Sequence, residues 1–217
     1  GHPLANKISL KSNMFKYRKI LKLDRKDLVI ALLPGSRMGE LKAHSDVLLE
    51  TAQNLLEVYP NARFLIPVNN DTNMSFIEAR VKNNPTKNLK LIKGKVDEIL
   101  SSSNMAIAAS GTASLQIALH KKPMIIIYKG SWVYYFVWKM VRLIPHVSLP
   151  NILLNEDIVP EMLQHRATPN LLSKKACEII RDKRYLKKIE SKFYKLHKDL
   201  KMNTSSLVIK VIKPHLK

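Results

Sequence analysis

One cysteine, six glycines and no long apolar run are the main scarcities of this 217-residue sequence. Cys177 has no second cysteine with which to form an internal disulfide, which excludes a disulfide-stabilised domain and fits a reducing, cytoplasmic setting. The longest uncharged stretch, residues 99–120, is rich in Ser, Asn, Gly and Thr and is too polar to span a membrane. With 46% hydrophobic residues, the composition is that of a folded globular protein.

Acidic residues are also scarce. The 37 Lys and Arg outnumber 17 Asp and Glu, which gives a formal net charge of +20. The excess lies at the two ends, since residues 1–26 hold eight basic residues and one acid, and residues 174–217 hold fourteen and four. Basic ends of this kind favour nucleic acid, an anionic membrane surface or solubility alone, and composition does not choose among them.

Several motifs of known chemistry are missing too. The sequence has neither the Gly-Lys-Ser/Thr of a P-loop nor the Gly-x-Gly-x-x-Gly of a dinucleotide-binding fold. No RNP, KH, zinc-finger or helix-turn-helix pattern accompanies the lysines, which disfavours nucleic acid as a partner. The seven histidines are scattered, without metal-ligand spacing or a Ser-His-Asp order.

Short apolar runs alternate with helical patterns through the middle of the chain. The runs predict strands at residues 28–33, 62–68, 89–92, 105–109 and 123–128, with 89–92 exposed or at an edge. Apolar residues three and four apart predict helices at 39–59, 73–81, 96–100 and 112–120. Strands that are apolar along their whole length indicate a parallel sheet. The expected fold class is therefore α/β, a Rossmann-like parallel sheet with helices on both faces.

Three parts follow along the chain. Residues 1–26 form a basic lead-in, residues 27–167 the Rossmann-like domain, and residues 168–217 a tail of basic helices. Cys177 falls in an apolar helical pattern of this tail and is expected in the core.

Two loops after predicted strands have the composition of phosphate-binding turns. Ligands of a parallel sheet bind at the carboxyl ends of its strands, where both loops are expected. Gly35-Ser36-Arg37 combines close backbone approach, free N–H donors and a guanidinium that pairs with phosphate oxygens. Ser110-Gly111-Thr112 places small hydroxylated residues at a helix start. An ordinary turn or helix cap explains either loop alone, but two in one sheet favour a diphosphate site.

A third block, residues 147–154, is predicted as a strand or extended segment, with Glu161 and Gln164 after it. Asn151 sets an amide among apolar residues there. A buried Asn needs hydrogen-bond partners, which the protein backbone supplies as readily as a substrate does. The role of Asn151 is therefore open on the residues alone.

Together the three blocks resemble lipid-A-disaccharide synthases. The matching residues are Leu33-Pro34-Gly35-Ser36-Arg37 with Glu40, Ala109-Ser110-Gly111-Thr112-Ala113, and Ser148-Leu149-Pro150-Asn151 with Val159, Glu161 and Gln164. The opening Gly1-His2-Pro3-Leu4 resembles the family segment where the first domain passes into the second. Each piece is weak by itself, but the combination covers nearly the whole chain in order and is specific.

The resemblance implies a GT-B glycosyltransferase, with two Rossmann-like domains, on the inner face of the cytoplasmic membrane. Such enzymes transfer 2,3-diacylglucosamine from UDP-2,3-diacylglucosamine to 2,3-diacylglucosamine 1-phosphate and release UDP, without a metal or other cofactor. The family's first domain, with its acceptor loop and proposed general base, has no counterpart here. We therefore expect a donor-binding half that lacks the amino-terminal acceptor domain.

Residue roles carry over by position. Arg37 and Asn151 are expected to be catalytic, and His2 is expected beside the cleft. The expected donor-binding residues are Gly35, Ser36, Ser110, Gly111, Thr112, Gln116, Glu161 and Gln164. Gln116 stands where many GT-B enzymes have a ribose-binding Glu, and it brings no charge. Glu40 is expected to cap its helix rather than act as a base.

Two alternatives and one partner stay open. A UDP-N-acetylglucosamine 2-epimerase-like enzyme shares the architecture, although its acidic and histidine catalytic set is not apparent, and a basic nucleic-acid-binding module would explain the charge.

Residues 132–144 are apolar nearly all round a helix, which fits a buried helix or an acyl-contacting surface equally well. With the basic ends, the second reading predicts an anionic membrane surface as a partner.

Overall fold

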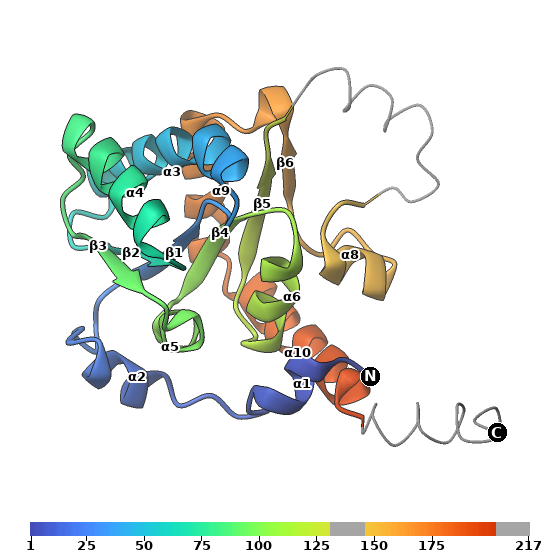
Figure 1. Cartoon of the computed structure of the whole chain (residues 1–217). Coiled ribbons are helices and arrows are strands. Elements are labelled where there is room, and N and C mark those ends of the chain that lie inside the picture. Colours follow the sequence, from blue (N-terminus) through green and yellow to red (C-terminus); the bar gives the residue numbers. More distant parts are fainter. Residues whose placement is uncertain (131–145, 203–217) are drawn as a thin grey trace, which may run out of the picture.

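The computed structural model describes residues 1–130 and 146–202 (Figure 1). Its centre is a sheet of six parallel strands in the order β3-β2-β1-β4-β5-β6. The strands are β1 Val29–Leu33, β2 Arg63–Val68, β3 Leu89–Lys93, β4 Met105–Ala109, β5 Met124–Tyr128 and β6 Glu161–Leu163. The helices are α1 Pro3–Lys7, α2 Met14–Ile20, α3 Met38–Val58, α4 Asp71–Asn83, α5 Val96–Ser102, α6 Thr112–Leu119, α8 Leu149–Leu154, α9 Pro169–Arg181 and α10 Lys183–Leu200.

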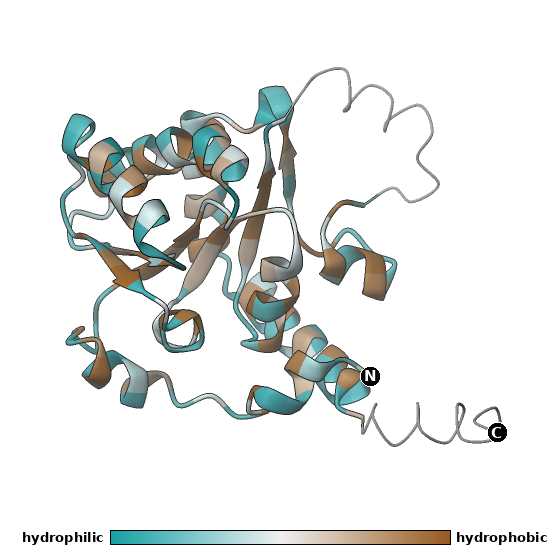
Figure 2. Cartoon of the chain, in the orientation of Figure 1, coloured by the Kyte–Doolittle hydropathy of each residue, from teal (hydrophilic) through white to brown (hydrophobic). Residues whose placement is uncertain are grey.

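Helices cover both faces of the sheet, as the apolar strands predict. Successive side chains of a strand point to opposite faces. Ile30 and Leu32 of β1 accordingly belong to the core cluster under α3 and α9, whereas Val29, Ala31 and Leu33 belong to the cluster under α5, α6 and α10. Figure 2 shows the brown, apolar sheet between the two helical layers. The α/β, Rossmann-like fold class is confirmed.

The predicted strands and helices between residues 27 and 130 are confirmed, with shifts of a few residues at their ends, and β3 is an edge strand. The prediction for residues 147–154 is wrong, because most of that block forms α8. Pro150 stands in the first turn of α8, where its missing N–H costs no hydrogen bond, and Asn155 ends the helix in the left-handed region. The short strand β6, which pairs with β5, was not predicted.

The carboxy-terminal segment is part of the core of the molecule. Phe193 and Ile189 of α10 are fully buried in the core cluster under α5, α6 and α10. On the other face of the sheet, α9 packs along α3. Cys177 is half-buried against the core cluster under α3 and α9, and this burial raises the pKa of its thiol. Residues 132–144 lie outside the described residues. Within residues 1–130 and 146–202, no helix combines the length and apolar character of a membrane span.

One buried arginine fastens the basic lead-in to the sheet. Arg18 of α2 is 2% exposed, and its guanidinium donates to the carbonyls of Asp24, Arg25 and Ser102 and to Oδ1 of Asn104. The same Asn104 oxygen accepts from the N–H of Val29, the first residue of β1. The lead-in is therefore ordered by charge-assisted hydrogen bonds rather than by apolar area.

We expect Arg18→Met to lower the free energy of unfolding by about 3 kcal/mol, because buried acceptors lose their donors while the aliphatic volume is kept. Lys19→Met removes the same charge from an exposed neighbouring position and should change stability little. Urea unfolding of both variants measures the difference. Equal stabilities would mean that the Arg18 bonds do not hold the lead-in.

Candidate functional site

A cavity of about 430 Å³ lies at the carboxyl ends of β1, β2 and β4. The two predicted phosphate loops both line it, with Gly35, Ser36 and Arg37 on one side and Ser110, Gly111 and Thr112 on the other. Gln116 lines it as well, and so does Asn69 after β2, which the sequence did not single out. Because β1 pairs with both β2 and β4, this edge is the point where the strand order reverses, the usual ligand position in such sheets.

Glu40 occupies the backbone donors of the first loop. Its Oε2 accepts from the N–H groups of Ser36, at 2.8 Å, and Arg37, at 3.3 Å. Gly35 has φ +113°, and a Cβ there would stand 2.4 Å from Cβ of Glu40, so glycine is required. The expectation of free N–H donors in this loop is therefore wrong, whereas the capping role of Glu40 is confirmed.

The Arg37 side chain is what the first loop offers to an anion. It is 87% exposed, and its only ion pair among the described residues is with Glu40, at 3.6 Å. An exposed pair at that distance contributes little. The guanidinium can therefore turn toward a phosphate in the cavity without losing a strong partner.

The second loop keeps only some of its backbone donors free, since the N–H of Ser110 donates to the carbonyl of Ile127 at 2.9 Å and that of Ser114 to the carbonyl of Gly111 at 3.1 Å. Gly111 precedes α6 with φ +152°, and no side chain of the described residues caps that helix. The first N–H groups of a helix have no intrahelical partner and attract anions. Ser110 turns its hydroxyl away and donates to the carbonyl of Val147 at 2.9 Å. The start of α6 thus supplies the backbone donors that the first loop lacks.

His44 of α3 ties the first loop to the end of β5. Its ring is 2% exposed; Nε2 accepts from the N–H of Lys129 at 3.0 Å, so the proton sits on Nδ1, which donates to the carbonyl of Pro34 at 3.0 Å. Burial, above all, lowers the pKa of His44, against the opposing effect of Glu40, while Lys129 lowers it further. The neutral ring is therefore a positioning group for the first loop.

The third block supports the second loop from behind and does not line the cavity. Asn151 is fully buried, and its amide donates to the carbonyl of Val159 and to Glu161, while Oδ1 accepts from the N–H groups of Ile158 and Val159. Glu161 also accepts from the N–H groups of Val147 and Ser148. Both side chains are therefore engaged within the protein, and their donor-site roles stay predictions.

The remaining predicted residues are dispersed. The Gln164 amide forms hydrogen bonds with both the N–H and the carbonyl of Gly130. The Gln116 amide, on the cavity wall, donates to Asp97 at 2.7 Å. The His2 ring accepts from the N–H of Leu4 at the start of α1, and the His2 N–H donates to the carbonyl of Leu200. His2 does not line the cavity. Within the part of the chain that the structure describes, no three His, Cys, Asp or Glu side chains gather as metal ligands.

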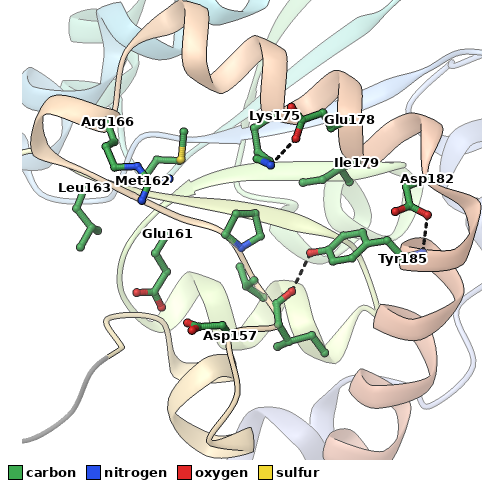
Figure 3. A pocket seen from close by; sticks show the side chains of 13 residues that line it. Asp157, Glu161, Met162, Leu163, Arg166, Lys175, Glu178, Ile179, Asp182 and Tyr185 are labelled. Atoms are coloured by element: carbon green, nitrogen blue, oxygen red, sulfur yellow. Dashed lines mark hydrogen bonds and ion pairs between the residues drawn. The ribbon is translucent and has the colours of Figure 1, made fainter.

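A larger hollow of about 560 Å³ lies beside β6, between that strand and helices α9 and α10 (Figure 3). Glu161 and Arg166 lie on its strand side, and Lys175 forms a close ion pair with Glu178 across from them. The hydroxyl of Tyr185 donates to the carbonyl of Ile158, and burial raises its pKa. Four acids line it against two bases, Arg166 and Lys175, so it is the weaker candidate for an anion.

Known proteins resemble the chain over its whole length. The lipid-A-disaccharide synthetase family model matches residues 1–212. The chain belongs to the lipid-A-disaccharide synthetase family. Lipid-A-disaccharide synthases from Methylobacillus flagellatus and Dechloromonas aromatica are 34% and 35% identical over 100% and 98% of this chain, but over only 58% and 56% of their own length. The chain therefore spans about half the length of these relatives.

Solved structures of a glycosyltransferase domain and of a UDP-sugar epimerase share the fold. The carboxy-terminal domain of a group 1 glycosyltransferase from Francisella tularensis gives a TM-score of 0.61 at 14% identity, covering 90% of this chain and 96% of that domain. A UDP-GlcNAc 2-epimerase from Neisseria meningitidis, bound to UDP-GlcNAc, gives 0.60 at 14% identity over 89% of this chain and 48% of that protein. These likenesses establish a GT-B half of Rossmann type in this family member.

We expect the stability of this family member to fall as pH drops through about 6.5, because unfolded histidine binds a proton that neutral, buried His44 does not. His197, whose pKa burial also lowers, contributes with the same sign. His44→Gln keeps one hydrogen-bond donor and one acceptor but cannot titrate. The free energy of unfolding of this variant should therefore fall less than that of the unaltered chain between about pH 8 and pH 5, the range in which histidine titrates. Urea unfolding at each pH measures it, and an unchanged slope would show that His44 is protonated in the fold.

Proposed function

We propose that this chain is the donor-binding half of a lipid-A-disaccharide synthase. The complete enzyme transfers 2,3-diacylglucosamine from UDP-2,3-diacylglucosamine to 2,3-diacylglucosamine 1-phosphate and releases UDP. The observation that carries the proposal is the cavity in which the Arg37 loop meets the start of α6. We place the donor domain at residues 27–167, since both loops fall within it.

The cavity suits the charge that develops on the leaving UDP. Free N–H groups at the start of α6 and the guanidinium of Arg37 are donors set on opposite walls of one space. Donors fixed before reaction stabilise a developing negative charge without having to reorganise. We therefore assign the diphosphate to this gap, with no metal ion or other cofactor in the chemistry.

Asn151 and Glu161 act in this proposal by position. Their shared hydrogen bonds fix the turn at residues 147–149, and that turn holds Ser110 and Ser114 through the Val147 carbonyl and the Leu149 N–H. A change at Asn151 therefore reaches the donor through the second loop. Gln116 is the one predicted ribose contact on the cavity wall, and its bond to Asp97 holds its amide there.

The base and the acceptor site must come from elsewhere in the proposed enzyme. Glu40 is the only acid among the described residues of the cavity wall, and its carboxylate is held by two backbone N–H groups and Arg37. Sugar transfer needs a base within hydrogen-bond reach of the acceptor hydroxyl. The greater length of the relatives gives room for the amino-terminal acceptor domain that would supply it.

The cellular setting belongs to the proposal as well. We place the protein in the cytoplasm, on the inner face of the cytoplasmic membrane, where acylated donor and acceptor would be met. Attraction of the basic ends to anionic lipid supports that location. Nucleic acid is not proposed as a partner.

We expect UDP to raise the melting temperature of this chain, because a ligand of the native state shifts the unfolding equilibrium. The Arg37→Ala variant should need about tenfold more UDP for the same rise in melting temperature, because it loses one charge-assisted hydrogen bond to the diphosphate. Lys42→Ala removes a like charge from an exposed position of α3, the helix that Arg37 precedes, and serves as the matched control. Thermal shift at increasing UDP compares the three proteins. Equal shifts in all of them would remove Arg37 from the site.

We expect the chain alone to bind UDP but to transfer sugar very slowly, and an amino-terminal half from a relative, added in trans, to restore turnover. Acceptor positioning contributes about 7–11 kcal/mol to such reactions, and a base about 10²–10⁴-fold. Release of UDP from the acylated donor is measured with and without the added half. Full turnover by the isolated chain would place the base within it.

A further inference from the structure

A second polar hollow lies at the other end of α6. It has a volume of about 480 Å³ and is lined by Lys11 and Ser12 of the lead-in, His120, Lys121 and Lys122 after α6, and Glu190 and Tyr194 of α10. Since α6 has eight residues at 1.5 Å each, this hollow is separated from the start of α6 by about 12 Å. None of its lining residues lines the cavity of the phosphate loops.

Lys122 is the unusual group in this hollow. It is only 7% exposed, its backbone N–H donates to the carbonyl of Ile117, and its ammonium forms no ion pair with an acid among residues 1–130 and 146–202. Burial, and then the neighbouring charge of Arg18, lower the pKa of Lys122 to about 8, although Glu190 opposes them. The Lys122 ammonium is not among the buried polar atoms that lack a partner, so the aliphatic stem is buried while the charge reaches the hollow, where an anion would pair with it.

The groups around Lys122 are complementary to a phosphate. The ammonium of Lys121 donates to the carbonyl of Ser9 and to Nδ1 of His197, which leaves its third N–H available. Lys11 is exposed at the rim, so three ammonium groups face one acid, Glu190. An adjoining hollow of about 370 Å³, which shares Lys11, Ser12 and His120, adds Lys7 and Lys16 and one acid, Asp97. This excess of two positive charges over the main hollow matches a phosphate dianion, and lysine binds phosphate as a point charge.

We propose that this hollow is a second anion site, which binds a phosphate group through Lys122, with Lys121 and Lys11 beside it. The phosphate is either that of a soluble phosphate monoester or that of a monoester lipid headgroup such as phosphatidic acid, since both present the same dianion. The site is separate from the proposed donor site and does not depend on that assignment.

The test uses inorganic phosphate as the probe, titrated into the chain by calorimetry with saturating UDP present. We expect Lys122→Gln to weaken phosphate binding about tenfold, the loss of one charge-assisted bond. Lys187→Gln, which removes a charge from an exposed position of α10, should bind as the unaltered chain does. Lys122→Arg should retain binding, and circular dichroism checks that each variant is folded.

A second arm separates the two sources of phosphate. Vesicles of phosphatidylcholine with and without phosphatidic acid are sedimented with the chain and with Lys122→Gln. Phosphatidic-acid-dependent binding that Lys122→Gln loses identifies a headgroup site, whereas calorimetric binding without any vesicle binding identifies a soluble ester. Equal phosphate affinity in Lys122→Gln and Lys187→Gln would overturn the proposal, because it would assign binding to overall charge. Loss of phosphate binding in the presence of UDP would overturn it as well.

Discussion

The parallel pairing of all six strands decides where this molecule can bind a ligand. Each strand is bonded only to neighbours that run the same way, so every loop that follows a strand opens at one edge of the sheet. The register of β1 with β4, from Ile30 with Met105 to Leu33 with Ala108, ends directly before the loops at 34–37 and 110–112. Because the chain leaves β1 toward β2 on one side and leaves β4 toward β5 on the other, a space opens between those loops. The cavity therefore follows from strand order, and the loop residues determine what it can bind.

Buried polar side chains give those loops their shape. His44 joins Pro34 to Lys129, Gln164 clamps Gly130, and Asn151 with Glu161 fixes the turn at 147–149. Each side chain satisfies backbone groups that no strand or helix satisfies, which buried structure requires. Such bonds are made once, on folding, so the donors at the start of α6 stand in place before a ligand arrives, whereas the exposed guanidinium of Arg37 turns to meet it. Preorganisation of this kind is what a site for developing charge needs.

Much of this architecture could be predicted from the sequence, and the failures have physical causes. Runs such as 29–33 are apolar throughout because both faces of the sheet are covered, and that pattern is visible in one dimension. By contrast, α8 has six residues and β6 has three, too few to show a period. Nor does spacing tell whether a polar side chain faces a ligand or its own backbone. Glu40 closes back on the N–H groups of its loop, and Lys122, in what looks like an exposed basic pair, is buried.

The two ends of α6 show how one helix can separate two kinds of anion recognition. Its start attracts negative charge through unpaired N–H groups and the helix dipole, so a glycine and small hydroxylated residues suffice there. Its end carries the opposite partial charge and would repel a phosphate, so any site at that end must be built from side-chain cations. Lys121 and Lys122 immediately after the helix meet that requirement, and they also balance the dipole. Between them, Gln116 and His120 both bond to one oxygen of Asp97, whose pKa His120 lowers, and this keeps a fixed negative charge between the two hollows. A fixed anion at that position disfavours migration of a phosphate from one end to the other, so the two sites differ in chemistry and do not merge into one basic groove.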